Sequence, residues 1–423
     1  MKNKKLVMAL AAVCLTVSVS GCGGKTAQLK ETVPAEGATT EAAATEAATT
    51  EAADGSEGKG GDAGSKGGTA ESGNEAEKTQ EAKAGGSGNS GGESAMDGQT
   101  RIITDSAGRE VEIPAEITKI APSGPLAQIV LYTVSPDRLA GLATDFSGEA
   151  KQYIDEKYWG LPKFGQFYGK NASLNMEALI AEAPDVIIDI GEAKKSVKED
   201  MDALQEQLDI PVIFVEATLP TMAEAYEMLG EITGDKEQAE KLASYCKNMI
   251  EKAGETAAAI ADKDRKSVYF ASGDDGLHTN AKGSIHADVI ERVGAVNAAD
   301  VEAVANGAGS EVSFEQLLLW EPDIIIVDKQ KLYDSIINDD MWKELAAVSE
   351  GRIYKIPSAP YSFMNSPPSV NRMIGIEWLG SLVYPEYYQA DIREEVKEFY
   401  QLFYHIDVTE EELDSILTDS LAK

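Results

Sequence analysis

Cysteine is scarce in this chain, and the position of each one excludes a disulfide framework. Only three of the 423 residues are cysteines. Cys14 lies in an apolar leader, and Cys22 directly follows the small residues "SVSG", which we interpret as a lipoprotein processing site. Cys246 is then left without an intramolecular partner, in a helical pattern where a small apolar side chain suits the core. No disulfide is therefore predicted.

Long apolar runs are also missing, and the one at the N-terminus is too short to span a membrane. Basic "MKNKK" precedes apolar "LVMALAAVCLTVSVS", which predicts a signal peptide over residues 1–21. Cleavage before Cys22 leaves a lipidated N-terminus, and two or more acyl chains hold a protein stably on a bilayer. An ordinary secretory signal with an incidental cysteine is the alternative. The expected location is the outer face of the cell membrane, on a Gram-positive surface or in a periplasm.

Aromatic residues are absent from the segment that follows. Between the lipidated Cys22 and residue 99 the chain consists almost entirely of Gly, Ala, Thr, Glu, Ser and Lys. Such a composition cannot bury enough apolar surface to offset the entropy lost on ordering. Residues 22–99 are therefore predicted to be a disordered linker of about 75 residues, with a span of roughly 50 Å.

Basic residues are outnumbered, and this excludes one class of partner. The chain has 38 Lys and Arg against 72 Asp and Glu, a formal net charge of -34. The acidic residues are spread along the chain, whereas binding to phosphate backbones needs a basic face. We expect no nucleic-acid partner, and we expect repulsion from anionic lipid surfaces.

Histidine is as rare as cysteine, which argues against a bare-metal site. A divalent metal ion usually needs three or four inward His, Asp or Glu ligands. The three histidines are His278, His286 and His405, so the first half of the chain contributes none. A histidine-rich zinc or manganese site is not expected.

One pattern, by contrast, is present twice. Residues 174–190, "LNMEALIAEAPDVIIDI", align without a gap with residues 312–328, "VSFEQLLLWEPDIIIVD", so that Glu177 matches Glu315. Each copy predicts a helix, a stop at Pro-Asp and a buried strand. The repetition indicates two similar lobes.

The alternation of helices with continuous apolar strands predicts an α/β fold of two lobes with mainly parallel sheets. Residues 100–220 are predicted to form the first lobe and residues 263–423 the second. Residues 221–262 are helical throughout, with one weak point at Gly234-Asp235, and predict one rigid inter-lobe rod of roughly 60 Å. Residues 138–144 are read as a strand. Two such lobes leave a ligand cleft at the carboxyl ends of their strands.

In order and spacing, these features resemble the substrate-binding lipoproteins of ABC importers, in the family that binds iron siderophores, haem and vitamin B12. The resemblance rests on "ITDSAGREVEIPAEITKIAPS", the two repeat copies, the helical residues 221–262 and "LAAVSEGRIYKIP", and it covers nearly everything from Thr104 onward. It implies a monomer without a resident cofactor that binds a small-molecule metal chelate and meets a permease dimer.

The same resemblance assigns a role to the repeated glutamates. In that family a surface glutamate on each lobe docks against permease arginines, and the matching residues here are Glu177 and Glu315. The alternative is a structural role, because acidic residues near a helix N-terminus stabilise caps and the helix dipole.

Loops that follow strands supply the candidate ligand-binding residues. Ser123 and Gly124 lie at a helix N-terminus, where free N–H groups suit an anion. The other candidates lie in three loop stretches of nine to fifteen residues later in the chain: Phe167, Tyr168, Gly169, His278, Thr279, Asn280, Ser284, His286, Tyr361, Phe363, Asn365 and Arg372. Ser123 as a helix cap, His286 packed on its helix and Arg372 paired with a surface acid are the structural alternatives.

These aromatic, hydroxyl and amide groups favour a bound chelate, and a ferric siderophore is the first expectation. Haem with Tyr168, His278 or Tyr361 as axial ligand stays open, as does cobalamin. Molybdate or tungstate held by Ser123 and Thr279 is a further alternative. Direct contact with the metal is not expected, with His278 and Tyr168 as the candidates if it occurs.

Signatures of catalysis are missing from the sequence. There is no nucleophile elbow, Walker loop, CxxC or paired-histidine motif. We therefore expect a binding protein and no enzyme. A surface scaffold or adhesin without a transport role is the remaining class.

Overall fold

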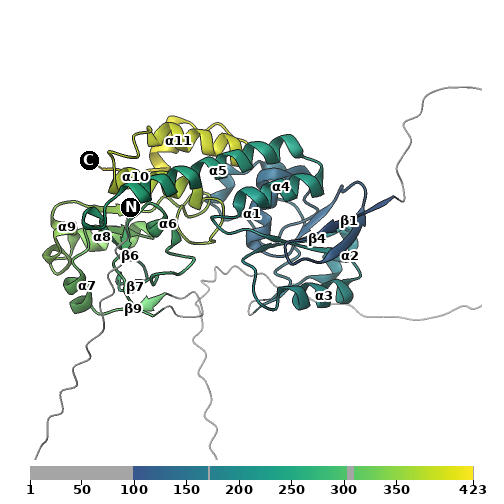
Figure 1. The fold of residues 1–423 in the computed structure, drawn as a ribbon, viewed down its shortest axis with the longest axis horizontal. Helices are drawn as coiled ribbons and strands as arrows, with labels where there is room; N and C mark the ends of the chain where they lie inside the picture. Colours follow the sequence, from purple (N-terminus) through teal and green to yellow (C-terminus); the bar gives the residue numbers. More distant parts are fainter. Residues whose placement is uncertain (1–98, 170–171, 303–308, 423) are drawn as a thin grey trace, which may run out of the picture. The chain divides into compact units, whose positions relative to one another are not determined.

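The computed structural model describes residues 99–169, 172–302 and 309–422, which belong to one structural unit (Figure 1). The predicted signal peptide, the lipidation site Cys22 and nearly all of the predicted linker lie outside these residues. No helix within the described residues is long and apolar enough to cross a bilayer.

The first lobe is built on a short parallel sheet. Its strands pair in the order β3 (Ile120–Pro122), β4 (Val186–Gly191) and β5 (Val212–Glu216), and nearly every residue of β4 and β5 is buried. An antiparallel hairpin of β1 (Thr100–Thr104) and β2 (Glu110–Pro114) precedes it. The helices of this lobe are α1 (Pro125–Val134), α2 (Met176–Glu182) and α3 (Val197–Leu208).

The second lobe repeats this plan with a four-stranded parallel sheet. The strand order is β11 (Ile353–Lys355), β10 (Ile324–Val327), β6 (Ser267–Ala271) and β8 (Val296–Asn297). A separate antiparallel pair joins β7 (His278–Thr279) to β9 (Ser310–Glu311). The helices around the sheet are α6 (Asp288–Arg292), α7 (Phe314–Trp320), α8 (Gln330–Asn338) and α9 (Ala346–Ser349). The predicted two-lobe α/β fold with mainly parallel sheets is confirmed.

The repeated Pro-Asp pair has a structural explanation. Asp185 accepts hydrogen bonds from the backbone N–H groups of Thr118 (2.6 Å) and Lys119 (2.8 Å), just before β3. Asp323 accepts one from Ser267 N–H (2.8 Å), at the start of β6. In each lobe the aspartate therefore fixes its own strand beside the neighbouring parallel strand, and this is a reason for repeating it.

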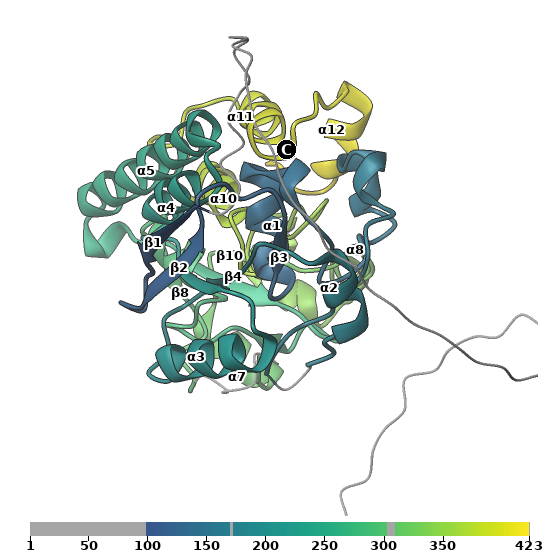
Figure 2. The same ribbon diagram turned by 90° about the vertical axis from the view of Figure 1, so that its right-hand side faces the viewer.

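Residues 221–262 do not form the single rod predicted from their pattern. They form α4 (Met222–Thr233) and α5 (Lys236–Ala259), which lie side by side (Figures 1 and 2). The chain reverses at Gly234, whose φ of 86° is a left-handed conformation suited to glycine. Gly230 lets the helices approach, because a Cβ there would lie 2.6 Å from the Cβ of Ala239. The rigid helix of the prediction is thus α5 alone, about 36 Å long.

The C-terminal segment returns from the second lobe to the first. It comprises α10 (Arg372–Val383), α11 (Ile392–Phe399), a π-helical turn (Tyr400–Tyr404) and α12 (Glu410–Ile416). The Gln238 side-chain amide on α5 donates to the carbonyl oxygens of Thr133 at the end of α1 (3.2 Å) and of Leu402 in the turn (2.9 Å). The lobes are therefore joined by more than one helix.

Two further expectations concern single segments. Residues 138–144 do not form a regular strand: a 3-10 turn covers Pro136–Arg138, and isolated bridges pair Leu139 with Ile120 and Leu142 with Lys163. The proline and the close packing of Gly141 on the Phe164 ring explain the interruption. Cys246 is fully buried in α5, as predicted.

Candidate ligand-binding site

A cavity opens at the carboxyl end of the first-lobe sheet. This first-lobe cavity measures about 410 Å³. Ser123 and Gly124 reach it from the end of β3, Asp189 from the end of β4, and Tyr168 and Gly169 from the loop before α2. Because parallel strands bring their carboxyl ends to one edge, loops distant in sequence meet here.

Asp189 is the central polar group of this cavity. It is only 3% exposed, and its Oδ2 accepts a hydrogen bond from the Tyr168 hydroxyl at 2.6 Å. Its Oδ1 accepts one from the Ser123 hydroxyl. Burial raises the pKa of Asp189, and the two hydrogen bonds act against this shift. Burial, and then the carboxylate of Asp189, likewise raise the pKa of Tyr168.

Sequence reasoning missed Asp189, although a signal existed. It is the one charged residue inside the apolar strand "VIIDI". A buried carboxylate at the end of a strand is rarely placed there by packing alone, because its desolvation must be offset by hydrogen bonds.

The loop that carries Tyr168 is held by its backbone. Gly165 has a φ of 81°, and a Cβ there would lie 2.1 Å from the Ser173 carbonyl oxygen, so no other residue fits. Phe167 N–H donates to the Ser123 carbonyl oxygen at 2.9 Å. The Phe167 side chain points into the core, which leaves Tyr168 to face the cavity.

A second cavity opens at the carboxyl ends of β6, β10 and β11. This second-lobe cavity measures about 480 Å³. Five predicted residues line it: His278, Asn280, His286, Tyr361 and Asn365. The structure therefore brings together residues from two loops that lie about eighty positions apart.

Main-chain hydrogen bonds fix several of these side chains. His286 Nδ1 lies 3.0 Å from the Asn365 carbonyl oxygen, which joins the two loops. Asn280 Nδ2 donates to the His286 carbonyl oxygen at 3.4 Å. The His278 ring packs on Gly273, where a Cβ would lie 2.7 Å from Nδ1.

Four other predicted residues lie behind the cavity wall. Thr279 and Phe363 are fully buried, and Ser284 accepts a hydrogen bond from His286 N–H at 3.3 Å without lining the cavity. Arg372 is also buried and is not paired with a surface acid alone: it donates to the Ile285 carbonyl oxygen at 3.1 Å. These residues support the loops, and the sequence pattern could not separate them from their exposed neighbours.

Burial and nearby charges shift the pKa of Arg372. Burial lowers its pKa to about 10, while the carboxylates of Asp288 and Glu192 act in the opposite direction. Glu192 lines the first-lobe cavity, so the acidic rim of that cavity acts on a residue of the second lobe.

A third cavity, of about 450 Å³, lies between the lobes. Glu149 and Tyr153 line it from the first lobe, and Lys329 and Lys355 from the second. It shares Lys329, Asp328 and Ser358 with the second-lobe cavity, so the two are neighbours. Burial lowers the pKa of Lys355, against an opposing effect of nearby acids.

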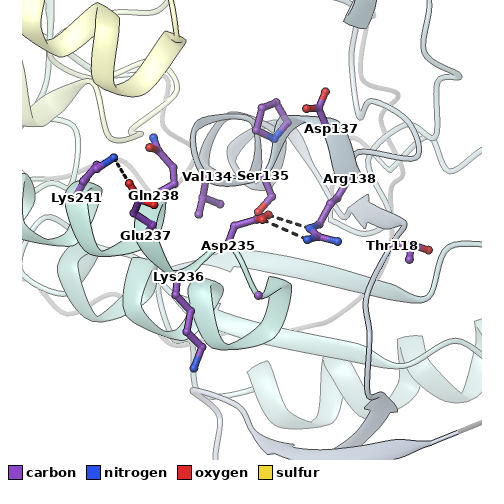
Figure 3. Close-up of a pocket in the computed structure, with 12 residues that line it drawn as sticks. Thr118, Val134, Ser135, Asp137, Arg138, Asp235, Lys236, Glu237, Gln238 and Lys241 are labelled. Carbon is purple, nitrogen blue, oxygen red and sulfur yellow. Dashed lines mark hydrogen bonds and ion pairs between the residues drawn. The ribbon is translucent and has the colours of Figure 1, made fainter. Parts of the chain in front are cut away.

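A larger cavity, about 740 Å³, lies elsewhere (Figure 3). It is formed at the C-terminal end of α1 and the turn between α4 and α5, whereas the first-lobe cavity lies at the N-terminal end of α1. Arg138 Nε and Nη2 donate to both carboxylate oxygens of Asp235 at 2.9 and 3.2 Å. This paired arginine holds α1 to the helix hairpin, and no predicted ligand residue lies here.

In the described part of the chain, no three His, Cys, Asp or Glu side chains lie close enough together to hold a metal ion. The two strand-end cavities offer phenol, imidazole, amide and hydroxyl groups together with carboxylate and ammonium groups.

The matching glutamates occupy equivalent exposed positions. Glu177 lies in the first turn of α2 and Glu315 in the first turn of α7. On each helix an aliphatic side chain lies about one turn further on: Ile180 is 65% exposed and Leu319 is 84% exposed. We call these two acidic and apolar surfaces the docking faces.

Comparison with known proteins decides the family. The family model described as "Periplasmic binding protein" matches residues 147–360, which is half of the chain. This chain belongs to the periplasmic binding protein family. The resemblance recognised in the sequence, to binding proteins of ABC importers, is thereby confirmed.

Relatives of this periplasmic binding protein match it over most of their own length. An uncharacterized ABC transporter substrate-binding lipoprotein of Bacillus subtilis is 24% identical over 294 residues, covering 67% of this chain and 85% of the relative. A vitamin B12-binding protein of Salmonella typhi is 27% identical over 263 residues, covering 62% and 80%. An ABC transporter solute binding protein from Sulfurospirillum deleyianum is 28% identical, with a TM-score of 0.69 over 75% of this binding protein and 98% of that chain.

Proposed function

We propose that this protein captures a ferric siderophore outside the cytoplasmic membrane and delivers it to the permease of an ABC importer, without catalysing a reaction. The observation that carries the proposal is the pair of cavities at the carboxyl ends of the two parallel sheets. Ligands of open α/β sheets bind at this edge. A few polar groups on a mostly preformed surface suit recognition of a small molecule.

An oxyanion is disfavoured, because one of its two predicted hydroxyl donors is engaged and the other is buried. The Ser123 hydroxyl donates to Asp189, and Thr279 is fully buried. The carboxylate of Asp189 also lies where molybdate or tungstate was expected to bind, beside the N-terminus of α1. The negative charge of Asp189 would repel an oxyanion bound beside it.

Cobalamin is the second candidate. The vitamin B12-binding relative of Salmonella typhi is 27% identical across 80% of its length. The polar side chains that line the second-lobe cavity, such as Asn280 and Asn365, suit a ligand with many amides as well as they suit a hydroxamate chelate. Haem fits less well, because the hydroxyl of one candidate axial ligand, Tyr168, donates a hydrogen bond to Asp189.

Thermal denaturation of the purified protein tests the proposal. The probes are a ferric tris-hydroxamate, a ferric tris-catecholate, cyanocobalamin, haem and molybdate, each added in excess. A ligand present at about 100 times its Kd stabilises the folded state by about 2.7 kcal/mol, which shifts the melting temperature by several degrees. Stabilisation by a ferric chelate supports the proposal. A shift with cyanocobalamin alone transfers the proposal to cobalamin, and no shift with any probe contradicts it.

We further propose that the docking faces meet the two subunits of the permease. Glu177 and Glu315 are exposed, separate and equivalent in the two lobes. Carboxylates attract basic partners over a distance, and the adjacent Ile180 and Leu319 offer apolar area that is removed from water on contact. A monomer with one face per lobe fits a two-subunit partner.

The lipid anchor is a proposal tested in cells. Cys22→Ala is expected to move the protein from the membrane fraction to the soluble fraction or the medium, because acyl chains supply about 0.8 kcal/mol per buried CH₂ and the acidic chain supplies no attraction to anionic lipid. Fractionation followed by immunoblotting measures this. Cys246→Ala is the matched control and should fractionate like the parent protein. Unchanged membrane association of Cys22→Ala would place the anchor elsewhere.

A further inference from the structure

The first-lobe cavity has an excess of acidic groups. Among the described residues that line it, the carboxylates of Asp189, Glu192 and Asp200 stand against one ammonium group, that of Lys194. Asp189 is buried, whereas Glu192 and Asp200 are exposed at the rim. No arginine occurs among the described residues that line this cavity.

The second lobe does not compensate for this excess. In its cavity the carboxylate of Asp328 lies beside Lys329, with an Nζ–Oδ2 distance of 3.7 Å. In the cavity between the lobes, Lys355 is balanced by Glu149. Arginine is again missing from the described lining of both cavities. Arg372 does not change this, because its side chain is fully buried behind the wall.

A cleft lined by one sign of charge concentrates ions of the opposite sign. The chain as a whole has a formal net charge of -34, so its overall field acts in the same direction. An anionic ligand would have to approach Asp189 and the two rim carboxylates with few cations to receive it. A neutral or cationic ligand meets no such barrier.

Ferric chelates also differ in net charge, according to the groups that bind the iron. Three hydroxamate groups, each with a single negative charge, neutralise Fe³⁺. Three catecholate groups, each with two negative charges, leave the complex with an excess of three negative charges. A pendant ammonium makes a tris-hydroxamate complex cationic. The classes therefore differ in net charge: the hydroxamate complexes are neutral or cationic, and the catecholate complex is anionic.

We propose that the bound chelate carries no net negative charge, and that it is a ferric hydroxamate whose cationic end lies against Glu192 and Asp200. This rests on the proposed function and names the class of siderophore. Both carboxylates reach the cavity near the N-terminus of α3, where Ser196 Oγ donates to Asp200 Oδ2 at 2.9 Å and fixes that carboxylate.

Titration calorimetry with three probes tests the proposal on the full-length protein. The probes are a ferric tris-hydroxamate with a free ammonium, the same chelate with that amine acetylated, and a ferric tris-catecholate. Acetylation is expected to weaken binding about threefold to tenfold, and the catecholate is expected to bind at least about a hundredfold more weakly. Raising the ionic strength should reduce the difference in affinity between the ammonium-bearing and the acetylated chelate, because exposed charges are screened.

Two variants assign this preference to the rim. The double variant Glu192→Gln, Asp200→Asn should bind the ammonium-bearing and acetylated chelates with nearly equal affinity. Glu199→Gln is the matched control: it is an exposed carboxylate on α3 beside Asp200 but outside the cavity, so the preference should persist. Both substitutions keep the size of the side chain and leave folding intact, which circular dichroism checks.

The outcomes separate the inference from the function on which it rests. Tighter binding of the catecholate, or an unchanged preference in the double variant, overturns the inference and leaves a siderophore-binding protein. Binding of neither class of ferric chelate overturns the proposed function itself.

Discussion

Reversal of both charges in the double variant Glu177→Lys, Glu315→Lys is expected to reduce uptake of the ligand far more than either single reversal, while ligand affinity stays at the parent value. Each glutamate lies in the first turn of its helix, and neither lines a strand-end cavity. If each lobe meets its own permease subunit, each reversal places a cation against a basic surface. Such like-charge contacts cost several kcal/mol, so uptake should fall about tenfold or more for each single change.

Uptake of radiolabelled ferric chelate by cells and calorimetry on the same purified variants measure the two halves of this expectation. Exposed substitutions rarely change stability by more than about 0.5 kcal/mol, so the variants should fold normally. Glu240→Lys is the control, because Glu240 is an exposed glutamate on α5, away from α2 and α7. Loss of affinity together with uptake would show that these glutamates support the ligand site. Full uptake by the double variant would leave them as residues that stabilise helix N-termini.

Arg109→Met is expected to lower the free energy of unfolding by about 3–5 kcal/mol, because it leaves a buried carboxylate without its partner. The side chains of Arg109 and Asp105 are 4% and 0% exposed, and Arg109 Nη1 lies 2.9 Å from Asp105 Oδ2. The same nitrogen donates to the Val212 carbonyl oxygen at 2.8 Å, so the pair attaches the N-terminal hairpin to β5. Phe214 N–H adds a further hydrogen bond to Asp105 at 3.2 Å.

Urea denaturation followed by circular dichroism measures this loss. Asp202→Asn is the matched control: its carboxylate also accepts from Arg109, at 2.7 Å, but its side chain is 57% exposed. A partly exposed ion pair contributes about 0–1 kcal/mol, so this change should be small. Since a domain of ordinary stability unfolds at a cost of about 5–15 kcal/mol, the difference between the variants is readily measured. Equal losses in both would mean that the buried pair contributes no more than the exposed one.

The sequence predicts those parts of the fold that have a clear local hydrophobic periodicity. The buried strands "VIIDI" and "DIIIVD" and the helices before them are found where the two copies of the repeat place them. Gly234 marks a break in a helical run, but a break does not reveal that α5 turns back along α4. That reversal depends on which apolar faces meet, and pairing at such distances is not contained in a local pattern.

The residues of the candidate site likewise fall into those that the sequence locates and those whose orientation it does not determine. Strand ends are local features, so Ser123, Tyr168 and His286 are found at cavities, as the strand-end argument indicates. Phe363 and Arg372 belong to the same kind of loop and are nevertheless buried. Which way a loop side chain points depends on packing against distant elements, and the sequence of the loop alone does not determine this. Their direct contact with ligand was predicted from loop position only, and the structure places them behind the wall.

The two hydrogen bonds of Gln238 have a consequence for the kinetics of ligand exchange. One amide holds the end of α1 and the C-terminal turn to α5, so we expect these three segments to move as one unit and closure of the lobes to be small. A site with little closure would retain its ligand mainly through direct contacts. The residence time of the ligand would then be determined by those contacts, and a competing ligand should replace it without a slow opening step.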